Sequence, residues 1–461
     1  MTTVTPTELR ARFARTLSAL YGREVPAYRT LVEVAQDVNA DVAASLGPDA
    51  ERLGSLDRVS EERHGAIRVG TPAELAQVGR IFAAMGMHPT GYYDLRDASA
   101  SAVPVVSTAF RPVDADELAA NPFRVFTSVL AATDRRFFSA DLSARLQAFL
   151  ARRELFPPRL LALADRAVAD GGLGEVDATE FLELAARAFA LSTEPIDRAW
   201  YAELERVSAV AADIGGVAST HINHLTPRVL DIDDLYARMS ARGITMIDAI
   251  QGPPRWDGPD VLLRQTSFKA LAEPRTFREP DGTVGQGALR VRFGEVEARG
   301  VALTREGRAR YDRAVVEVDA AGAAKAAAVW AAHFPRTEAE LFSSGLGVCT
   351  VQAVPDRPRD GRTPTGDVAA LVRDGWLRTA PVVYEDFLPR SAAGIFQSNL
   401  TEAGSKDATV DAADLDADWL EGVLDRPLHD PFDLYGAQHR ASVEAALAEL
   451  GVAPRPAPVQ G

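Results

Sequence analysis

An internal repeat constrains this chain of 461 residues more than any other feature. The segments 64–69 and 224–229 both read His, then Arg four positions later, then Val. The agreement continues downstream, because Phe110 lies 46 residues beyond the first His and Phe268 lies 44 residues beyond the second. Chance matching of short apolar patterns is the alternative, but the register holds at three separated places. The sequence therefore predicts two similar modules.

Each copy is expected to run strand, helix, then further strands, which makes the chain an α+β protein. One copy is too small to bury both faces of a curved sheet. The two βαβββ-type modules should therefore pair as a central curved sheet or barrel around a cavity. The predicted organisation is a helical N-terminal segment at 1–60, a first module at 61–130, a helical insertion at 131–215, a second module at 216–304, an α/β segment completing the pocket at 305–440, and a C-terminal helix with a disordered tail at 441–461.

The composition argues against several classes of function. Sixty-five acidic against 50 basic residues give a net charge of −15, which disfavours nucleic acid because phosphates need a basic face. Cys349 is the one cysteine, so no internal disulfide or cysteine-based zinc site can form. No stretch approaches the roughly 20 apolar residues of a membrane span, and the N-terminus lacks a signal-peptide pattern. We expect a cytoplasmic protein without a membrane partner.

Two of the seven histidines, His64 and His224, occupy equivalent positions in the two copies. Because alternate residues of a strand share a face, each lies on the same side as the arginine four positions later, Arg68 or Arg228. The predicted concave face thus gathers two imidazoles and two guanidinium groups. His221 should point to the opposite face and support the strand. A structural role in the core is the alternative for each strand histidine.

A third ligand is expected from the last strand of the second copy. Glu295 and Glu297 share one face by parity, so strand alternation does not choose between them. The repeat aligns Glu295 with Ser128, which leaves a carboxylate in one copy alone, as a single metal requires. With His64 and His224, this glutamate would complete the facial triad typical of non-haem Fe(II) oxygenases. A solvated strand face is the alternative for Glu295.

Five longer motifs stand out along the chain: RHGAIRVGT at 63–71, MHPTGYYDL at 87–95, STAFRP at 107–112, THINHLTPR at 220–228 and YEDFLPRSAAGIFQSNL at 384–400. Together they resemble the motifs of a known family, the 2-oxoadipate dioxygenase/decarboxylases (hydroxyglutarate synthases), which have the vicinal-oxygen-chelate fold. The likeness covers about residues 10–440. The stretch 293–300 is also similar to the terminal strand of 4-hydroxyphenylpyruvate dioxygenase-like enzymes, where the corresponding glutamate binds iron, and this favours Glu295 over Glu297.

The resemblance implies that 2-oxoadipate and O2 are converted to 2-hydroxyglutarate and CO2, late in lysine breakdown. It implies Fe(2+) as the cofactor and carries the metal ligands onto the two histidines and the glutamate named above. Arg68 corresponds to the binder of a substrate carboxylate, for which the fork of a guanidinium is suited. Arg390 and Ser391 fall in a loop that touches substrate. A small apolar residue is expected at position 390, so Arg390 leaves the preference among 2-oxo diacids open.

Two other functions remain open from the sequence. The first is a glyoxalase-like lyase or isomerase of the same fold, using Zn or Ni without O2. Glyoxalase-type sites carry a carboxylate from each half, and Ser128 replaces one of them here. The second is a ligand-binding module, which has no need of a metal triad. The favoured interpretation is an enzyme whose partners are a small 2-oxo diacid and O2.

Overall fold

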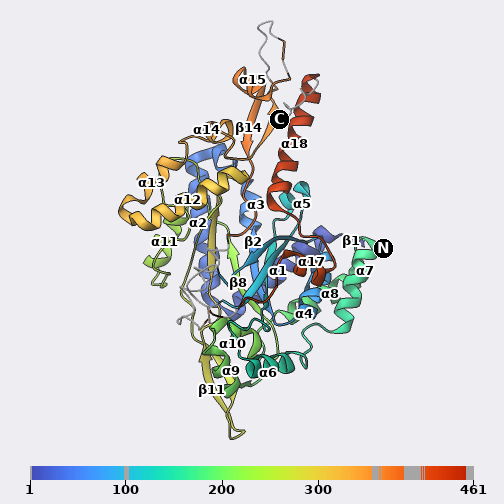
Figure 1. Ribbon diagram of the computed structural model, residues 1–461. Coiled ribbons are helices and arrows are strands. Elements are labelled where there is room, and N and C mark those ends of the chain that lie inside the picture. Colours follow the sequence, from blue (N-terminus) through green and yellow to red (C-terminus); the bar gives the residue numbers. More distant parts are fainter. Residues whose placement is uncertain are drawn as a thin grey trace.

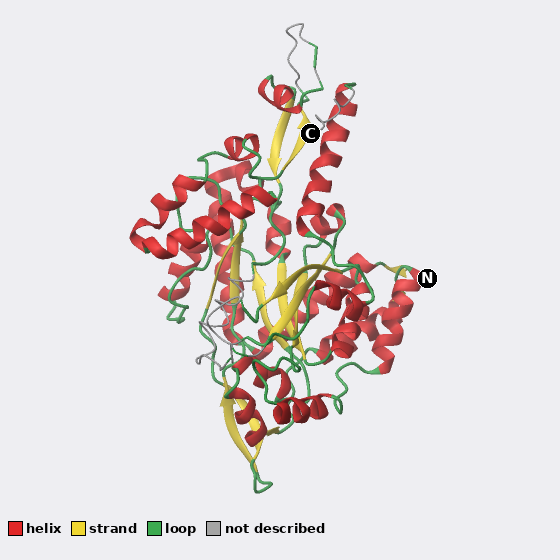
Figure 2. Cartoon of the chain, viewed as in Figure 1, coloured by secondary structure: helices red, strands yellow, loops and turns green. Residues whose placement is uncertain are grey.

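The computed structural model describes residues 3–97, 103–355, 363–364, 366–388, 406, 409 and 411–452. Helices lie on either side of a central group of strands, which gives a mixed α+β structure (Figures 1 and 2). Within the described ranges, no helix is long and apolar enough to cross a membrane.

The N-terminal segment forms helices that begin at clear sequence signals. The Thr5 side chain accepts a hydrogen bond from the backbone of Glu8, and the Glu8 carboxylate accepts one from the backbone of Thr5. This capping box, followed by Pro6 at the first helical position, fixes where the first helix starts. The elements are α1 (Pro6–Glu24), α2 (Pro26–Leu46), the 3-10 helix η1 (Gly47–Glu51) and α3 (Leu56–Glu61).

A five-stranded sheet with the order β3–β4–β5–β2–β8 occupies the centre. β2 runs parallel to β5 and antiparallel to β8, so the first strands of the two predicted copies are neighbours. The remaining pairs, β3 with β4 and β4 with β5, are antiparallel. The elements are β2 (Arg63–Val69), α4 (Pro72–Ala83), β3 (His88–Asp94), β4 (Val105–Arg111), α5 (Ala115–Ala120), β5 (Arg124–Leu130) and β8 (Ile222–Pro227).

A second ladder lies beside β8. In it, β12 (Glu295–Arg299) pairs antiparallel with β9 (Leu263–Ser267). Arg228 bridges to Glu297 in the parallel sense, and the backbone N–H of Val229 donates to the Glu297 carbonyl at 2.8 Å. Among the described strands, β3 and β9 do not pair with each other. The arrangement is therefore open, and the barrel form of the prediction is wrong; the division into two modules stays a prediction.

Helices and short strands fill the remaining segments (Figure 1). Between β5 and β8 lie β6 (Leu173–Gly174), which pairs with β1 (Thr3–Val4), and α6 (Ala140–Leu150), α7 (Pro158–Asp170), α8 (Glu175–Ala188), β7 (Ile196–Asp197), α9 (Arg198–Glu205) and α10 (Ala209–Gly215). The later elements are α11 (Ile232–Ala241), β10 (Glu273–Arg278), β11 (Val284–Leu289), α12 (Arg305–Ala321), η2 (Ala323–Lys325), α13 (Ala326–His333), α14 (Glu338–Ser343), β13 (Cys349–Ala353), α15 (Val368–Arg373), β14 (Leu377–Pro381), α17 (Ala417–Leu424) and α18 (Pro431–Leu450).

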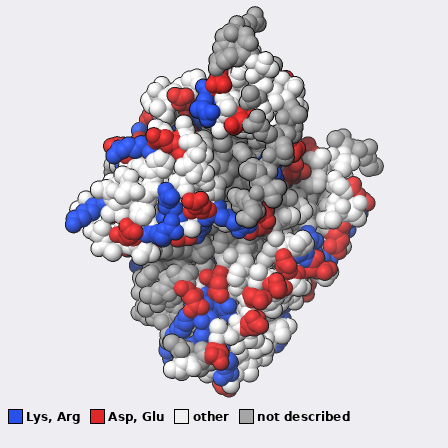
Figure 3. Space-filling model, turned by 45° about the horizontal axis from the view of Figure 1, so that its top comes forward, with Lys and Arg blue, Asp and Glu red and all other residues white. Residues whose placement is uncertain are grey.

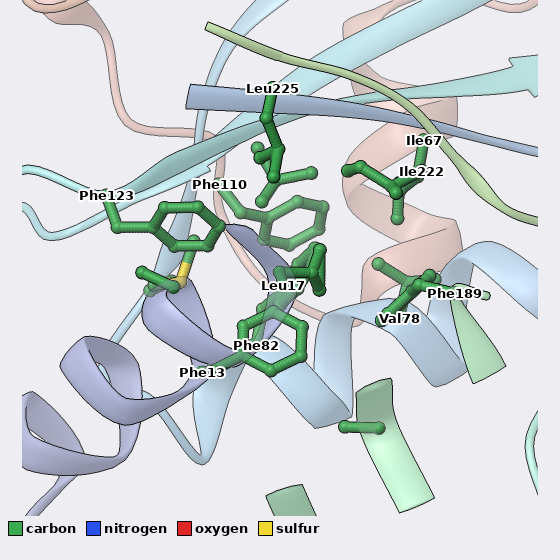
Figure 4. Packing of buried hydrophobic residues seen from close by; sticks show 14 of the residues in the cluster. Phe13, Leu17, Ile67, Val78, Phe82, Phe110, Phe123, Phe189, Ile222 and Leu225 are labelled. Atoms are coloured by element: carbon green, nitrogen blue, oxygen red, sulfur yellow. The ribbon is translucent and has the colours of Figure 1, made fainter. Parts of the chain in front are cut away.

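The two faces of the central sheet are covered differently. On one face, Ile67 and Phe110 join Phe13 of α1 and Phe82 of α4 in the main hydrophobic core (Figure 4). Burial of such side chains contributes about 25 cal/mol for each Å² of apolar surface. Because side chains alternate along β2, the residues between those core positions point to the other face. That second face carries the candidate site.

The surface carries charged side chains of both signs. In the view of Figure 3, acidic and basic side chains are interspersed over the face of the molecule. An example is the exposed pair in which Arg145 NH1 donates to Glu203 Oε2 at 2.9 Å. Exposed pairs of this kind contribute little to stability, because water and salt screen them.

Candidate metal centre

The structure brings the three predicted metal ligands together. Nε2 of His64 lies 3.5 Å from Oε1 of Glu295, and Nε2 of His224 lies 3.5 Å from Oε2 of the same carboxylate. The two imidazole rings have centroids 5.5 Å apart and planes at 86°. One ligand atom from each residue lies within 4.8 Å of the other two. All three side chains are buried, so bulk water is kept from the cluster.

Strand pairing explains how these distant residues meet. Ala66 of β2 is opposite His224 of β8, so His64, two residues before Ala66 on the same face, is a diagonal neighbour of His224. The bridge between Arg228 and β12 then brings the start of β12, Glu295, alongside β8. The cluster thus depends on long-range strand contacts that no local segment contains.

The donor set fits a divalent metal ion. Ligand atoms about 2.1 Å from a metal and at right angles lie roughly 3 Å apart, near the N–O separations seen here. Nδ1 of His224 is buried and has no hydrogen-bond partner among the described residues. Burial, with the positive charges of His64 and Arg68 adding to it, lowers the pKa of His224 well below its ordinary value. Its ring is therefore neutral, as a metal ligand must be.

The glutamate of the cluster lacks a full counter-charge. Burial raises the pKa of Glu295 above its ordinary value, and His64 offsets this effect in part. A carboxylate removed from water in this way is costly unless a cation is nearby. A bound metal ion would supply that charge, so the electrostatics of Glu295 agree with the geometry.

Glu297 has a different place from Glu295. Its carboxylate accepts two hydrogen bonds from Arg299, Nε to Oε1 at 2.6 Å and NH2 to Oε2 at 3.0 Å. Burial alone would raise its pKa, but Arg299 and His64 outweigh burial and hold the pKa well below the ordinary value. For His64, burial alone would lower the pKa, but Glu297 and Glu295 outweigh burial and raise the pKa above its ordinary value. The structure thus distinguishes two glutamates that parity left equivalent: Glu295 faces both histidines, and Glu297 belongs to an outer ion pair.

A buried ionic network continues behind the cluster. Arg124 NH1 lies 3.6 Å from Glu297, and both terminal nitrogens of Arg124 donate to Glu62, at 2.5 and 3.0 Å. Arg124 also donates to Glu385 at 2.6 Å. Arg228 donates to Glu62 at 2.9 Å, and this pairing accounts for its burial. The guanidinium of Arg228, predicted to converge on the cavity with that of Arg68, is therefore part of this network.

Aromatic rings border the cluster. Phe387 lies with its ring centroid 5.0 Å from that of His64 and 5.1 Å from that of Phe126, both at steep angles. Phe293 lies 5.2 Å from the ring of His224. These rings fix the orientation of the imidazoles and exclude water from their edges.

Arg68 lies on the same strand face as the first ligand, four residues further along β2. Its NH1 donates to Oδ2 of Asp213 at 2.5 Å, and both side chains are buried. Asp213 belongs to α10, in the helical segment between the two halves. The other predicted substrate contacts, Arg390 and Ser391, lie outside the described residues.

A β-bulge changes the predicted orientation of one histidine. Asn223 is bypassed where β8 pairs with β2, and a bypassed residue reverses the alternation of side chains. The spacing of three between His221 and His224 therefore no longer places them on opposite faces. Nε2 of His221 lies 3.4 Å from Oδ1 of Asp213, the partner of Arg68. The prediction that His221 faces away from the site is wrong.

Sequence reasoning missed Asp213 and Phe387. Asp213 lies 145 residues from Arg68 in a segment with plain helical periodicity, so no local signal indicated the contact. Phe387 lies in the motif 384–400, and its place in a motif shared with a family was the available signal.

The fold and the cluster together define a class of protein, mixed α+β chains with a buried set of two histidines and one carboxylate. Residues 13–399 match the family described as 2-oxoadipate dioxygenase/decarboxylase. The chain belongs to this enzyme family, as the sequence motifs predicted.

Known relatives cover almost the whole chain. The 2-oxoadipate dioxygenase/decarboxylase of Mycobacterium tuberculosis is 61% identical over 430 residues, which is 93% of this chain and 96% of that protein. The protein of the same name from Pseudomonas putida is 39% identical over 468 residues, 97% of this chain and 98% of that one. The crystal structure of the hydroxyglutarate synthase in complex with 2-oxoadipate from Pseudomonas putida superposes with a TM-score of 0.83 at 38% identity, covering 97% of this chain and 99% of that chain.

Proposed function

We propose that this protein is an Fe(II)-dependent dioxygenase/decarboxylase that converts 2-oxoadipate and O2 to 2-hydroxyglutarate and CO2 in lysine catabolism. One observation carries the proposal: His64, His224 and Glu295 converge in a buried cluster in a chain of this family. The Pseudomonas putida relative has been crystallised with 2-oxoadipate, which supports a 2-oxo diacid as the substrate here.

The protein side chains supply a site of suitable charge and shape for iron. The two imidazoles, each deprotonated at its ligand nitrogen, and the carboxylate would hold the ion from one side and leave positions open for substrate and oxygen. When bound, Fe(II) would hold a 2-oxo acid and O2 side by side and make their reaction accessible. Phe387 and Phe293 border the ligand histidines, so their rings protect that reaction from solvent.

In this proposal, Arg68 holds the far carboxylate of the substrate. Its Cα is four residues from that of His64 along β2, a span of roughly 13 Å. The small side chain of Ala66 lies between them on the same face. Arginine's fork pairs with a carboxylate through two hydrogen bonds. From the family motif, we further propose that the loop holding Arg390 and Ser391 touches the substrate.

The test is oxygen-electrode turnover by anaerobically purified, Fe(II)-loaded protein across a series of 2-oxo diacids. We expect O2 consumption and CO2 release with 2-oxoadipate, in equal amounts, and no turnover by the His224→Ala protein. Equal turnover in the absence of O2 would instead support the lyase or isomerase interpretation. Diacid binding that survives complete removal of metal, without any turnover, would support a ligand-binding module.

A further inference from the structure

Asp213 makes an unusually complete set of contacts for a residue in a helical insertion. Its Oδ2 accepts from Arg68 NH1 at 2.5 Å and from Asn223 Nδ2 at 3.0 Å. Its Oδ1 lies 3.4 Å from Nε2 of His221, which in turn lies 3.1 Å from Asn223 Nδ2. Both oxygens of the carboxylate therefore face polar groups on the sheet.

Side-chain hydrogen bonds hold the backbone directly after Asp213. Arg153 donates to the carbonyls of Ile214 and Val217, at 2.7 and 3.0 Å, and Trp200 Nε1 donates to the carbonyl of Gly215 at 2.9 Å. Asp213 lies in the last turn of α10, so these hydrogen bonds limit the movement of the backbone that carries its carboxylate. The helical insertion thus presents one fixed anion to the face of the sheet that holds the metal cluster.

A fixed anion matters because an arginine side chain is long and flexible. Ordering such a side chain costs conformational entropy. Burial raises the pKa of Asp213, but His221 and Arg68 outweigh burial and leave the pKa below its ordinary value, so the carboxylate is ionised. An ionised Asp213 both balances the buried guanidinium and orders it before any substrate arrives. Preorganisation of this kind gives affinity and selectivity to a binding group.

We propose that Asp213 is a positioning residue for Arg68, and that this pair sets the preference of the enzyme for 2-oxo diacids over 2-oxo monoacids. Asn223, at the bulge in β8, donates to the same oxygen, Oδ2 of Asp213, and helps to position that carboxylate. The proposal rests on the proposed function, because it assigns a partner to the residue that binds the far carboxylate. It gives the helical insertion a part in substrate choice.

The experiment compares kcat/KM for 2-oxoadipate with that for 2-oxohexanoate, which has the same chain length but ends in a methyl group. We expect Asp213→Ala to lower the ratio of the two values about tenfold, mainly by raising KM for the diacid. Asp213→Asn, which keeps the shape and one acceptor, should lower it less. Glu203→Ala, which removes an exposed insertion carboxylate from its pair with Arg145, is the matched control and should leave the ratio unchanged.

A double-mutant cycle separates positioning from general damage. In an Arg68→Ala background, Asp213→Ala should change the ratio no further, because it acts through the guanidinium alone. Iron content and thermal midpoint are measured for every variant, and Asp213→Asn serves if the alanine variant fails to fold. Equal losses with both acids, or additive effects of the two substitutions, would overturn the proposal.

The result also distinguishes this proposal from the proposed function. A wild-type enzyme without any preference for the diacid overturns the assignment of Arg68 and the role of Asp213 together. A wild-type preference that Asp213→Ala leaves intact overturns the role of Asp213 alone.

Discussion

Nδ1 of His64 lies 3.1 Å from Oε2 of Glu297, while Nε2 of the same ring faces Glu295. Nδ1 makes no hydrogen bond among the described residues, so its contact with Glu297 is an ion pair. A carboxylate behind a ligand histidine fixes the orientation of the ring and raises its basicity. The candidate metal ligands are thus held from the outside by charged groups.

Replacing the outer carboxylate should weaken metal binding without abolishing it. We expect Glu297→Gln to lower affinity for Fe(II) about 10–100-fold, because the ring of His64 loses the anion that orients it. Competition with a coloured chelator under anaerobic conditions measures the affinity. Glu273→Gln removes another buried carboxylate from an ion pair, with Arg292, and should leave the affinity unchanged. An unaltered affinity for Fe(II) in Glu297→Gln would contradict the proposal that Glu297 orients the ring of His64.

Loss of a ligand histidine should remove both metal and its stabilising effect. A ligand that binds the folded state alone raises stability with its concentration, so added Fe(II) should raise the thermal midpoint of the wild-type protein. His224→Ala should show no such rise and no O2 consumption. His333→Ala, which removes a ring from its contact with the exposed Glu317, is the control. Retention of stoichiometric iron by His224→Ala would exclude the triad.

Tyr21 of α1 should stabilise the strands that carry two ligands. Its hydroxyl lies 2.7 Å from the Phe293 carbonyl, to which it donates, and 3.1 Å from the Asn223 carbonyl. Tyr21→Phe leaves these buried acceptors without that donor, at a cost of about 1–3 kcal/mol in unfolding free energy. Urea unfolding measures the change. Tyr28→Phe, which removes a hydroxyl that shares a hydrogen bond with the part-buried Ser18, should cost less. Equal costs would argue against a stabilising role of the Tyr21 hydroxyl.

Acid should destabilise the protein through Glu62. Burial would raise its pKa, but Arg228 and Arg124 outweigh burial and hold the pKa below the ordinary value of 4.5. Because the folded-state pKa is the lower one, the stabilisation is complete above the unfolded-state value and is lost as the pH falls through the folded-state value. Urea midpoints of the wild type should therefore fall more steeply below about pH 4.5 than those of Glu62→Gln. Parallel curves would show that this network does not set the acid sensitivity.

Patterns within the sequence identified the residues that are candidates to bind a metal. The repeat placed His64 and His224 in register, and the motifs indicated the family that the comparisons confirm. The structure brings these two histidines together, and a histidine at an equivalent strand position is a local signal. Local signals also marked where helices begin, as in the capping box at Thr5 and Glu8.

The tertiary structure alone decided how the site is assembled. The bulge at Asn223 turned His221 toward the site, and the pairing of Glu297 with Arg299 separated it from Glu295. Asp213 reached Arg68 from a helix far away in the chain. Strand register, bulges and buried ion pairs depend on the packing of distant segments, so periodicity and parity within one segment carry no information about them.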